Sequence, residues 1–401
     1  MRYMMFRVKA ELWGGMMTRT LMISLALGVL LLSGCVTTEV QEQKQKKVFY
    51  PEPPDLPRYQ FLRSYKGAVD FDKEQSAFDA FIVGKQKAGQ TMEKPYGLAI
   101  YDGVIYVADT NISLIMLDLN KEKFDILPGS RGLGKLVLPI NIAIDPDGNK
   151  YVADPVRKQI LQYDRGGFFL KEFKVPRDWK PVDVEVVENR LYVADNENHE
   201  VVVFDRDSGD VLQRLGKEGL ERQQQLELPV NIAISPDGFL YVVDAGRFQV
   251  IKYDLDGHFI ETIGKAGRSP GEFARPKGIA IDRDGLIYVV DAAFSNIQVF
   301  HSSGQLLTIF GNPGKEPGNL DLPAGISIDY DKKNIELFRK DIDENFEVEY
   351  LILVSNQIGD RLVSVFGCGK QKGENYESFE TLLEKRKKLL QEEMLQNKEK
   401  K

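Results

Sequence analysis

Five aspartates recur at the ends of short apolar stretches, and they are the first candidates for chemistry in this sequence. Each is the last residue of a phrase such as YVVD, which occupies residues 241–244. The five are Asp109, Asp154, Asp195, Asp244 and Asp291. A carboxylate can serve as a general base or as a metal ligand. A residue needed for catalysis is needed once, however, so the repetition favours a structural role in which each carboxylate accepts backbone N–H groups of the following loop.

The stretches that end in these aspartates belong to a repeat that the chain contains six times. A phrase resembling PVNIAI precedes each copy, and its six occurrences begin at Pro95, Pro139, Pro181, Pro229, Pro276 and Pro323. These prolines are spaced about 42 to 48 residues apart, and such a period with several short apolar runs per unit is typical of β-propellers. Asp-Gly and Pro-Asp-Gly turns separate the runs, as β-hairpins require.

We therefore predict an all-β fold, a six-bladed β-propeller with four antiparallel strands in each blade, over residues 58–372. The sixth unit lacks a fourth strand, and residues 58–67 have the pattern of a strand without a neighbour. We expect this N-terminal strand to pair with the last blade and close the ring. Residues 331–350 form an insertion in blade six, which we expect to be a lengthened hairpin. Residues 373–401 predict a charged amphipathic helix, either packed on the propeller or forming a coiled coil with a partner.

The N-terminal segment predicts export and lipid attachment. Arg19 precedes an apolar run from Leu21 to Leu32, which has the length of a signal peptide. The run ends in LSGC, which resembles the lipobox of bacterial lipoproteins and implies lipidation of Cys35. Residues 1–34 would then be the signal peptide and residues 35–57 a lipidated tether. Because Val36 rather than Asp follows the cysteine, the resemblance to enterobacterial sorting rules implies the outer membrane of a Gram-negative bacterium.

Charge and cysteine content limit the classes of partner. The chain has a formal net charge of −7, and an exported acidic protein has neither the charge nor the compartment of a nucleic-acid binder. With Cys35 committed to lipid, Cys368 is left alone, so we expect no internal disulfide. The partners that we expect are another envelope or extracellular protein and the membrane, the latter through the lipid.

The connectors between the repeats resemble a known family. Two connectors resemble those of NHL repeats: GKAGRSPGEFARPKGIAI (264–281) and GNPGKEPGNLDLPAGISI (311–328). The phrases YVVD and IQVF, which follow the first connector, are part of the same resemblance. Together with the lipobox, they make the chain similar to the NHL-repeat lipoproteins of bacteria, which implies a six-bladed NHL propeller. The fold alone does not imply one activity. Amidating lyases of this group hold zinc with histidines, but His199, His258 and His301 fall too far apart in the predicted blades to share a metal.

Candidate binding residues gather on one predicted face of the propeller, where the loops between the second and third strands meet the connectors between blades. These loops carry Arg157, His199, Arg247, Phe248 and Phe294. Exposed aromatic residues beside arginine are common in protein interfaces, although scattered surface aromatics need no such role. We predict a protein-binding or scaffolding module of the cell envelope, without a catalytic residue.

The mouth of the central channel on the same face is a second candidate site. The second residue after each leading proline places Asn141, Asp183 and Asn231 on three adjacent blades. Their oxygen atoms are ligands that Ca²⁺ accepts. The other interpretation is that these side chains line a water-filled channel, with no cofactor. The alternative function is accordingly a calcium-dependent hydrolase, or a lyase or lactonase-like enzyme, with its site at the channel mouth.

Overall fold

The structure is a computed structural model that describes residues 47–71, 90–217 and 219–378, together with residues 381, 384, 385 and 388. Cys35 and the predicted signal peptide lie outside these residues, as does most of the predicted C-terminal helix. The four described residues beyond 378 are helical and exposed. No helix among the described residues is long and apolar enough to span a membrane.

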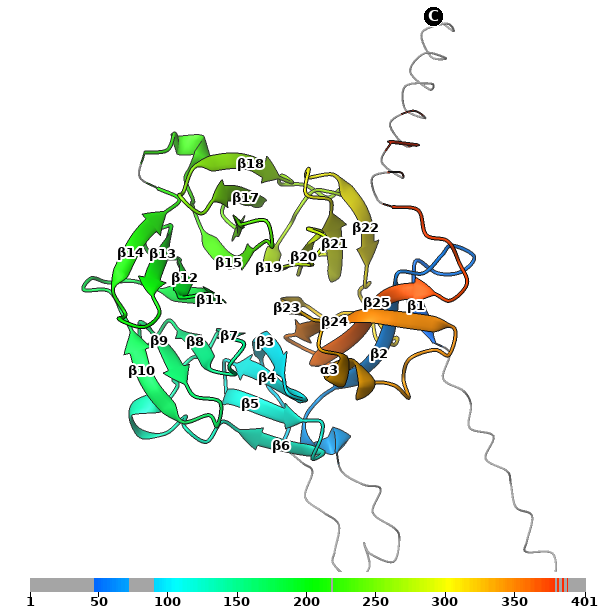
Figure 1. Cartoon of the computed structure of the whole chain (residues 1–401), viewed down its shortest axis with the longest axis horizontal. Coiled ribbons are helices and arrows are strands. Elements are labelled where there is room, and N and C mark those ends of the chain that lie inside the picture. The colour runs from blue at the N-terminus through cyan, green and yellow to red at the C-terminus, as the bar shows by residue number, and fades with distance from the viewer. Residues whose placement is uncertain are drawn as a thin grey trace, which may run out of the picture. The chain divides into compact units, whose positions relative to one another are not determined.

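Six antiparallel sheets stand around a central axis as the blades of a propeller, which confirms the predicted fold class (Figure 1). From the axis outward, blade one consists of β3 (Pro95–Tyr101), β4 (Val104–Asp109), β5 (Ser113–Asp118) and β6 (Lys123–Ile126). Blade two consists of β7 (Asn141–Ile144), β8 (Lys150–Asp154), β9 (Gln159–Tyr163) and β10 (Phe169–Phe173). Blade three consists of β11 (Pro181–Val187), β12 (Arg190–Asp195), β13 (Glu200–Asp205) and β14 (Val211–Leu215). Blades four to six are β15 (Pro229–Ile234), β16 (Phe239–Asp244), β17 (Gln249–Asp254) and β18 (Phe259–Ile263); β19 (Pro276–Ile281), β20 (Ile287–Asp291), β21 (Asn296–Phe300) and β22 (Leu306–Phe310); β23 (Pro323–Asp329), β24 (Phe346–Asn356), β25 (Val363–Gln371), β2 (Tyr59–Tyr65) and β1 (Val48–Tyr50).

The burial of each strand follows from its place in the blade. The second and third strands are continuous apolar runs because neighbouring blades cover both of their faces, and every residue of β4 is buried. The outermost strands are more exposed because one of their faces meets solvent; in β18, partly buried residues alternate with exposed ones up to the buried Ile263. The core is therefore divided among the seams between blades; at one of them, Tyr192 of blade three and Tyr253 of blade four share a cluster.

The ring closes as predicted, through an N-terminal strand. Strand β2 pairs with β25, with Tyr59 opposite Cys368 and Tyr65 opposite Val363. The predicted tether, however, needs a correction at its end, because residues 48–50 form β1 and pair with β2 as a fifth strand. These three residues are apolar or aromatic, and by pairing they cover the edge that β2 would otherwise expose.

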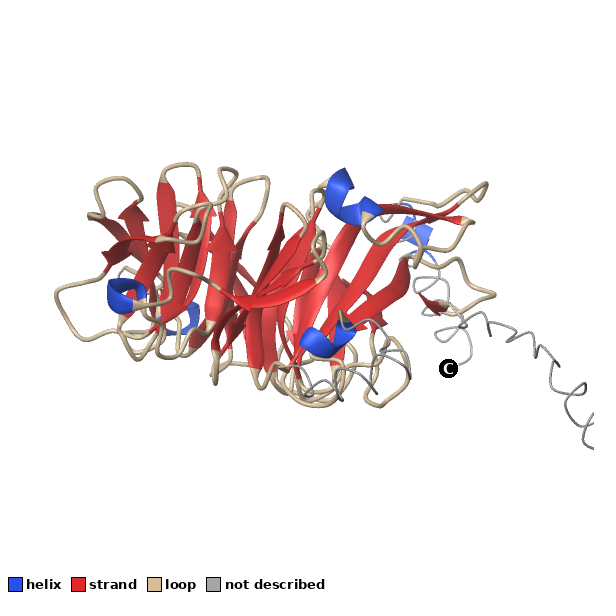
Figure 2. Cartoon of the chain, turned by 90° about the horizontal axis from the view of Figure 1, so that it is seen from below, coloured by secondary structure: helices blue, strands red, loops and turns tan. Residues whose placement is uncertain are grey.

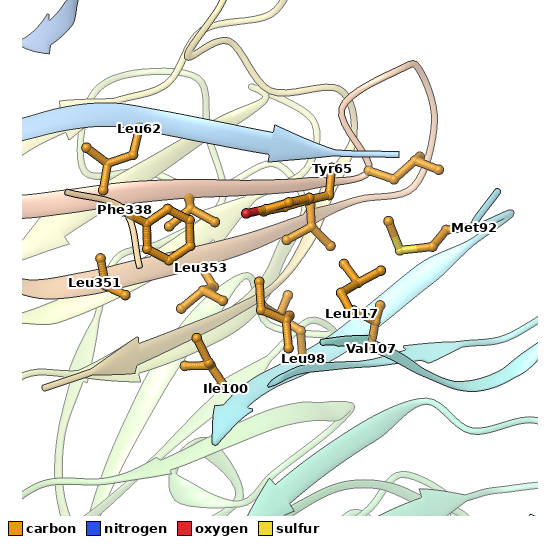
Figure 3. Close-up of a cluster of buried hydrophobic side chains, with 14 of the residues drawn as sticks. Leu62, Tyr65, Met92, Leu98, Ile100, Val107, Leu117, Phe338, Leu351 and Leu353 are labelled. Carbon is orange, nitrogen blue, oxygen red and sulfur yellow. The ribbon is translucent and has the colours of Figure 1, made fainter. Parts of the chain in front are cut away.

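The seam between blades six and one shows how this closure is packed (Figure 3). Leu62 of β2 and Leu351 of β24 share an apolar cluster with Leu98 and Ile100 of β3. The insertion of blade six contributes Phe338, which is fully buried in the same cluster. We expected a lengthened hairpin here; the connection instead contains the short helix α3 (Lys332–Glu336), since its apolar residues have a seam to cover.

The loops lie along two faces of the disc (Figure 2). Pairing of Pro229 with Asp244 places the start of β15 beside the end of β16, and the other blades repeat this arrangement. The connectors between blades and the loops between second and third strands therefore share one face, the connector face. The turns between first and second strands form the opposite face, the hairpin face. Three short 3-10 helices, η1 (Ala68–Asp70), η2 (Gly132–Gly134) and η3 (Arg222–Gln224), complete the described elements.

Candidate functional site

The recurring aspartates hold the connector face together. The carboxylate of Asp244 accepts N–H groups of the preceding connector, from Glu227 at 2.6 Å and Leu228 at 2.9 Å. It also accepts the N–H groups of Gly246 and Arg247 in the following loop. The other four repeat aspartates likewise bond both to the connector and to the loop. The structural role is therefore observed, and the bond to the connector is a part of it that the sequence did not indicate.

Two of the predicted binding residues are engaged within the protein. The guanidinium of Arg247 donates to the carbonyl oxygens of Gln223 at 2.9 Å and Arg222 at 2.5 Å. Arg157 donates in the same way to the carbonyls of Leu133 and Lys135. Both side chains thus fix a connector against a loop. A third arginine, Arg361 of blade six, bonds to the connector carbonyls before β23 and was not singled out from the sequence because its repeat is degenerate.

The remaining loop candidates differ in exposure. His199 and Phe248 occupy the same turn position, with φ of 59° and 56°, and both are exposed. This left-handed conformation is uncommon for residues with bulky side chains. Phe294 lies one position earlier in its own loop and is only partly exposed. The structure thus leaves His199 and Phe248 most accessible to a partner.

Large exposed hydrophobic residues distinguish the two faces. On the connector face they are Leu133, Val137, Val156, Leu228, Phe248 and Ile358. Leu133 is 80% exposed and Ile358 is 58% exposed. Among the described residues, the turns between first and second strands contain none of this class; on the same side of the disc, the turn before β10 exposes Phe168 (62%) and the turn before β2 exposes Leu56 (39%). Further exposed hydrophobic residues lie on the outer strands, including Leu170, Leu212 and Ile260.

The three channel candidates lie at the connector-face end of a cavity on the central axis. This cavity, of about 510 Å³, is lined by the inner strands from Asn141, Asp183 and Asn231 to Tyr101 and Pro146 on the hairpin face. The three are buried rather than displayed on the connector face. The connector-face end is narrow because adjacent inner strands approach each other closely there. A Cβ on Gly325 would lie 2.3 Å from a backbone oxygen of the next inner strand, and a glycine at this position permits that approach.

The structure brings together two of these three side chains. The carboxylate of Asp183 accepts Asn231 Nδ2 at 3.2 Å and the N–H groups of Ile232 at 2.7 Å and Val184 at 2.9 Å. The Oδ1 atom of Asn141 accepts its neighbouring N–H, from Ile142. The Asp183 carboxylate thus accepts the N–H of Ile232 in β15. Because β15 is an innermost strand, no further strand is available on that side to accept this N–H. These oxygens do not form a ready cage for Ca²⁺, which takes six to eight oxygen ligands.

Two carboxyl groups of the cavity bind protons unusually tightly. Burial raises the pKa of Asp183 to about 7, although its three N–H donors oppose the shift. Burial and the nearby Asp183 raise the pKa of Glu185 to about 8. Loss of solvent disfavours the charged form of each group. Glu185 was not singled out from the sequence; the available signal was its position in a strand where the other five repeats carry alanine or serine.

A buried lysine marks the opposite end of the inner strands. Lys277 donates to Gln357 Oε1 at 2.8 Å, and its Nζ lies 4.9 Å from the ring centroid of Tyr96. Burial, with Arg275 and Lys94 nearby, lowers the pKa of Lys277 to about 8. The sequence reasoning missed this residue, although the other five inner strands carry an uncharged residue at this position.

The histidines are dispersed, in agreement with the sequence analysis. His258 bonds to Asp254 at 2.8 Å in a turn of blade four, and His301 bonds to Ser303 in blade five. No group of three His, Cys, Asp or Glu side chains in the described part of the chain is arranged to hold a metal ion. Cys368 is buried and free.

Comparison with known proteins agrees with this architecture. The family model for the NHL repeat matches residues 179–204, and a family model described as a 6-bladed beta-propeller matches residues 221–292. The chain thus carries NHL repeats and forms a six-bladed β-propeller.

Solved structures with the same fold have diverse descriptions. A Bacteroides thetaiotaomicron protein of unknown function is 15% identical, with a TM-score of 0.54 over 77% of this chain and 75% of its own. A Xanthomonas campestris gluconolactonase is 15% identical, with a TM-score of 0.51 over 79% and 90%. An auxiliary nutrient binding protein of Bacteroides thetaiotaomicron is 12% identical, with a TM-score of 0.51 over 70% of each chain. At these identities the likeness concerns the fold alone.

Proposed function

We propose that this protein is a lipid-anchored, extracytoplasmic β-propeller that binds another protein of the cell envelope or extracellular space through its connector face. The observation that carries the proposal is the unequal distribution of exposed hydrophobic residues between the two faces. Apolar surface that is rimmed by polar groups is a recurring feature of protein-binding sites.

The rigidity of the connector face also supports this function. The aspartates and the arginines Arg157 and Arg247 bond the loops to the connectors. Exposed side chains such as Val156 and Phe248 are therefore presented on a fixed backbone, which reduces the conformational entropy that binding must remove. The NHL repeat supplies the scaffold, and the loops supply the contacts.

A matched pair of variants tests the proposal. The connector-face variant combines Val156→Ser, Phe248→Asn and Ile358→Ser; the control combines Leu170→Ser, Leu212→Ser and Ile260→Ser on outer strands. Each full-length protein is crosslinked in its own membranes, captured, and its partner quantified by mass spectrometry. We expect the connector-face variant to retain at least about tenfold less of the partner than the wild type or the control, because interface hot spots dominate affinity. Equal capture by all three proteins would contradict the proposal.

The lipid anchor requires its own test, because Cys35 lies outside the described residues. Replacing Cys35 by serine removes the thiol that would carry the lipid. We expect the variant to move from the membrane fraction to the soluble extracytoplasmic fraction. Unchanged fractionation of this variant would refute lipid attachment at Cys35.

A second candidate function is a metal-dependent hydrolase or lactonase-like enzyme in the central cavity. The raised pKa values of Asp183 and Glu185 favour it, since a carboxyl group that titrates near neutrality can exchange protons with a substrate. Calcium titration of the wild type and of Asp183→Ala distinguishes this candidate. Binding that is lost in the variant would support the metal site, and metal-free wild-type protein that does not take up Ca²⁺ would reject it.

A further inference from the structure

Glu185 interrupts a ring of small residues around the central axis. It is the fourth residue after the proline that leads its repeat, and the residues at the same position of the other five repeats are Ala99, Ala143, Ala233, Ala280 and Ser327. All six residues line the central cavity. Five of the six positions are thus occupied by side chains that leave the axis open, and blade three alone places a carboxylate there.

The other acidic groups of the cavity wall already have partners. Asp145 forms an ion pair with Arg206 at 3.3 Å and accepts the hydroxyl of Tyr151. Asp329 accepts the side-chain amide of Asn334 at 3.0 Å. Asp183 accepts three N–H groups, as described above. No cation shifts the pKa of Glu185. Burial and the charge of Asp183 raise this pKa, and the neighbouring N–H of Val186 opposes the rise. In the described part of the chain, Asp183 and Glu185 are therefore both without a cation, but Asp183 accepts three N–H groups, whereas Glu185 is left with the N–H of Val186 alone.

An unpaired amide oxygen belongs to a residue of the same cavity wall. Asn231 is 3% exposed, lines the cavity and donates its Nδ2 to Asp183. Its Oδ1 atom is buried and has no hydrogen-bond partner among the described residues. A buried acceptor without a donor is destabilising. Such an atom is explained when a ligand donates to it.

Among the described residues, no lysine, arginine or histidine contributes to the wall, which combines aliphatic side chains with polar ones such as Asp145, Ser327 and Asp329. Isoleucines such as Ile144, Ile234 and Ile281 line its sides, and its volume of about 510 Å³ exceeds that of a single ion or water. The cavity thus combines acidic side chains and the unpaired Asn231 Oδ1 with aliphatic side chains, and its described wall holds no cation. We propose that it binds an organic ammonium ion, with the cation against Glu185, N–H donation to Asn231 Oδ1, and the apolar part of the ligand against the inner strands.

Several properties favour an ammonium ion over a metal. An ammonium group has only donors, and one carboxylate with one amide oxygen can satisfy it. A calcium ion requires several more oxygen ligands, and the oxygens of Asp183 and Asn141 are engaged by N–H groups. The isoleucines of the wall would also bury hydrocarbon of the ligand, which is favourable. This ligand site opens on the hairpin face and is separate from the proposed protein-binding face.

Calorimetric titration of the full-length chain tests the proposal. The probe is 4-phenylbutylamine, its neutral counterpart is 4-phenylbutan-1-ol, and CaCl₂ is titrated separately. We would work at about pH 8.5, where Glu185 is largely ionised and an alkylamine still carries its proton. The variants are Glu185→Ala, which introduces the residue that most other blades carry, and Glu185→Gln, which keeps the shape. Glu197→Ala removes the same charge from an exposed loop of the same blade and serves as the control.

The expected result is selective binding of the amine. The wild type and the Glu197 variant should bind the amine at least about tenfold more tightly than the alcohol, a ratio that corresponds to about 1.4 kcal/mol. Both Glu185 variants should lose at least about tenfold in amine affinity, while their thermal unfolding shows that they are folded. Any of four results would overturn the proposal. These are equal affinity for amine and alcohol, unchanged amine binding by Glu185→Ala, absence of amine binding by the wild type, and binding of Ca²⁺ alone.

Discussion

The connector face and the hairpin face are built from the same repeat, yet they differ in how their polar groups are used. On the connector face, each buried aspartate accepts N–H groups from two chain segments, and Arg157 and Arg247 bond to connector carbonyls. On the hairpin face, the turns between the inner strands and their neighbours are short in blades one to five, and the central cavity opens there with Glu185 in a wall whose described residues include no cation. The comparison teaches that the repeated aspartates and the two arginines of the first face bond to the protein itself, whereas Glu185 in the cavity has no cation in the surrounding wall as described.

Two ionisable residues of the inner strands, Lys277 at the connector-face end and Glu185 along the cavity, also differ, because one is basic and the other acidic. At the connector-face end, Lys277 lies among other cations and has a lowered pKa. Along the cavity, Glu185 lies near Asp183 and has a raised pKa. Both shifts disfavour the charged form, but they act on stability in opposite directions as pH changes.

The largest effect that we expect separates two aspartates of blade four. Asp244→Ala removes the acceptor of four N–H groups and should lower the free energy of unfolding by about 3–4 kcal/mol. Asp254→Ala, in a partly exposed turn at the other end of β17, should lower it by less than about 1 kcal/mol because water replaces the carboxylate. Urea unfolding measures both. Equal losses would show that the two faces do not differ in this respect.

The next effect concerns Glu185 and carries a defined pH window. Its folded-state pKa of about 8 lies above its ordinary value of 4.5, so the folded protein holds this proton more tightly than the unfolded chain. Its contribution to stability is present below about pH 4.5 and is lost as the pH rises to about 8. Glu185→Ala should therefore be more stable than the wild type by about 2 kcal/mol at pH 9, a value reduced for solvent in the cavity, with little difference at pH 4.5.

The measurement for Glu185 is the difference between wild-type and variant unfolding free energies across this pH range. Taking the difference cancels the titration of groups that both proteins share. Asp183 remains in both proteins, and loss of its like-charged neighbour should lower its pKa, which adds to the stabilisation of the variant. A difference that does not change with pH would show that Glu185 titrates normally.

Lys277→Met should give the opposite slope with a smaller magnitude. The folded-state pKa of about 8 lies below the ordinary value of 10.5, so the unfolded chain binds more protons between these pH values. The wild type should gain stability as the pH rises through this window, by about 1–2 kcal/mol, and the variant should lack this gain. Thermal unfolding at pH 8 and at pH 10 provides the measurement. A gain of the same size in the variant would assign the titration to another group.

The smallest expected effect is at Phe248. Asparagine tolerates the left-handed conformation that this position adopts, and the phenyl ring is exposed. Phe248→Asn should therefore change the free energy of unfolding by less than about 0.5 kcal/mol. If urea unfolding shows a loss above about 1.5 kcal/mol, the ring stabilises the fold itself, and its use as a binding probe would be compromised.

The repeat made the architecture predictable. Alternation of apolar runs with Asp-Gly turns at a period in the forties indicated four-stranded blades, and the missing strand of the last unit indicated closure by residues 58–67. Both are confirmed. The strand at residues 48–50 and helix α3 were not predicted, because each is a single short segment whose structure depends on the blade edge or seam that it covers.

The candidate site was less predictable, for a physical reason. Hydrogen bonds between distant segments, such as those from Arg247 to the carbonyls of the preceding connector, leave no mark in the spacing of residues. The same holds for the position of the cavity. Asn141, Asp183 and Asn231 were correctly placed on adjacent inner strands, but the sequence could not show that the strands close together on one side of these residues and leave space on the other.

The sequence by itself determined the number of blades, the order of the strands and the structural use of the repeated aspartates, because these depend on local patterns that recur in every unit. Tertiary structure decided which polar groups are satisfied and which remain free. That distinction depends on the approach of segments far apart in the chain, as when Asp183 of blade three accepts an N–H of blade four while Glu185, two residues later, lies at the cavity without a cation.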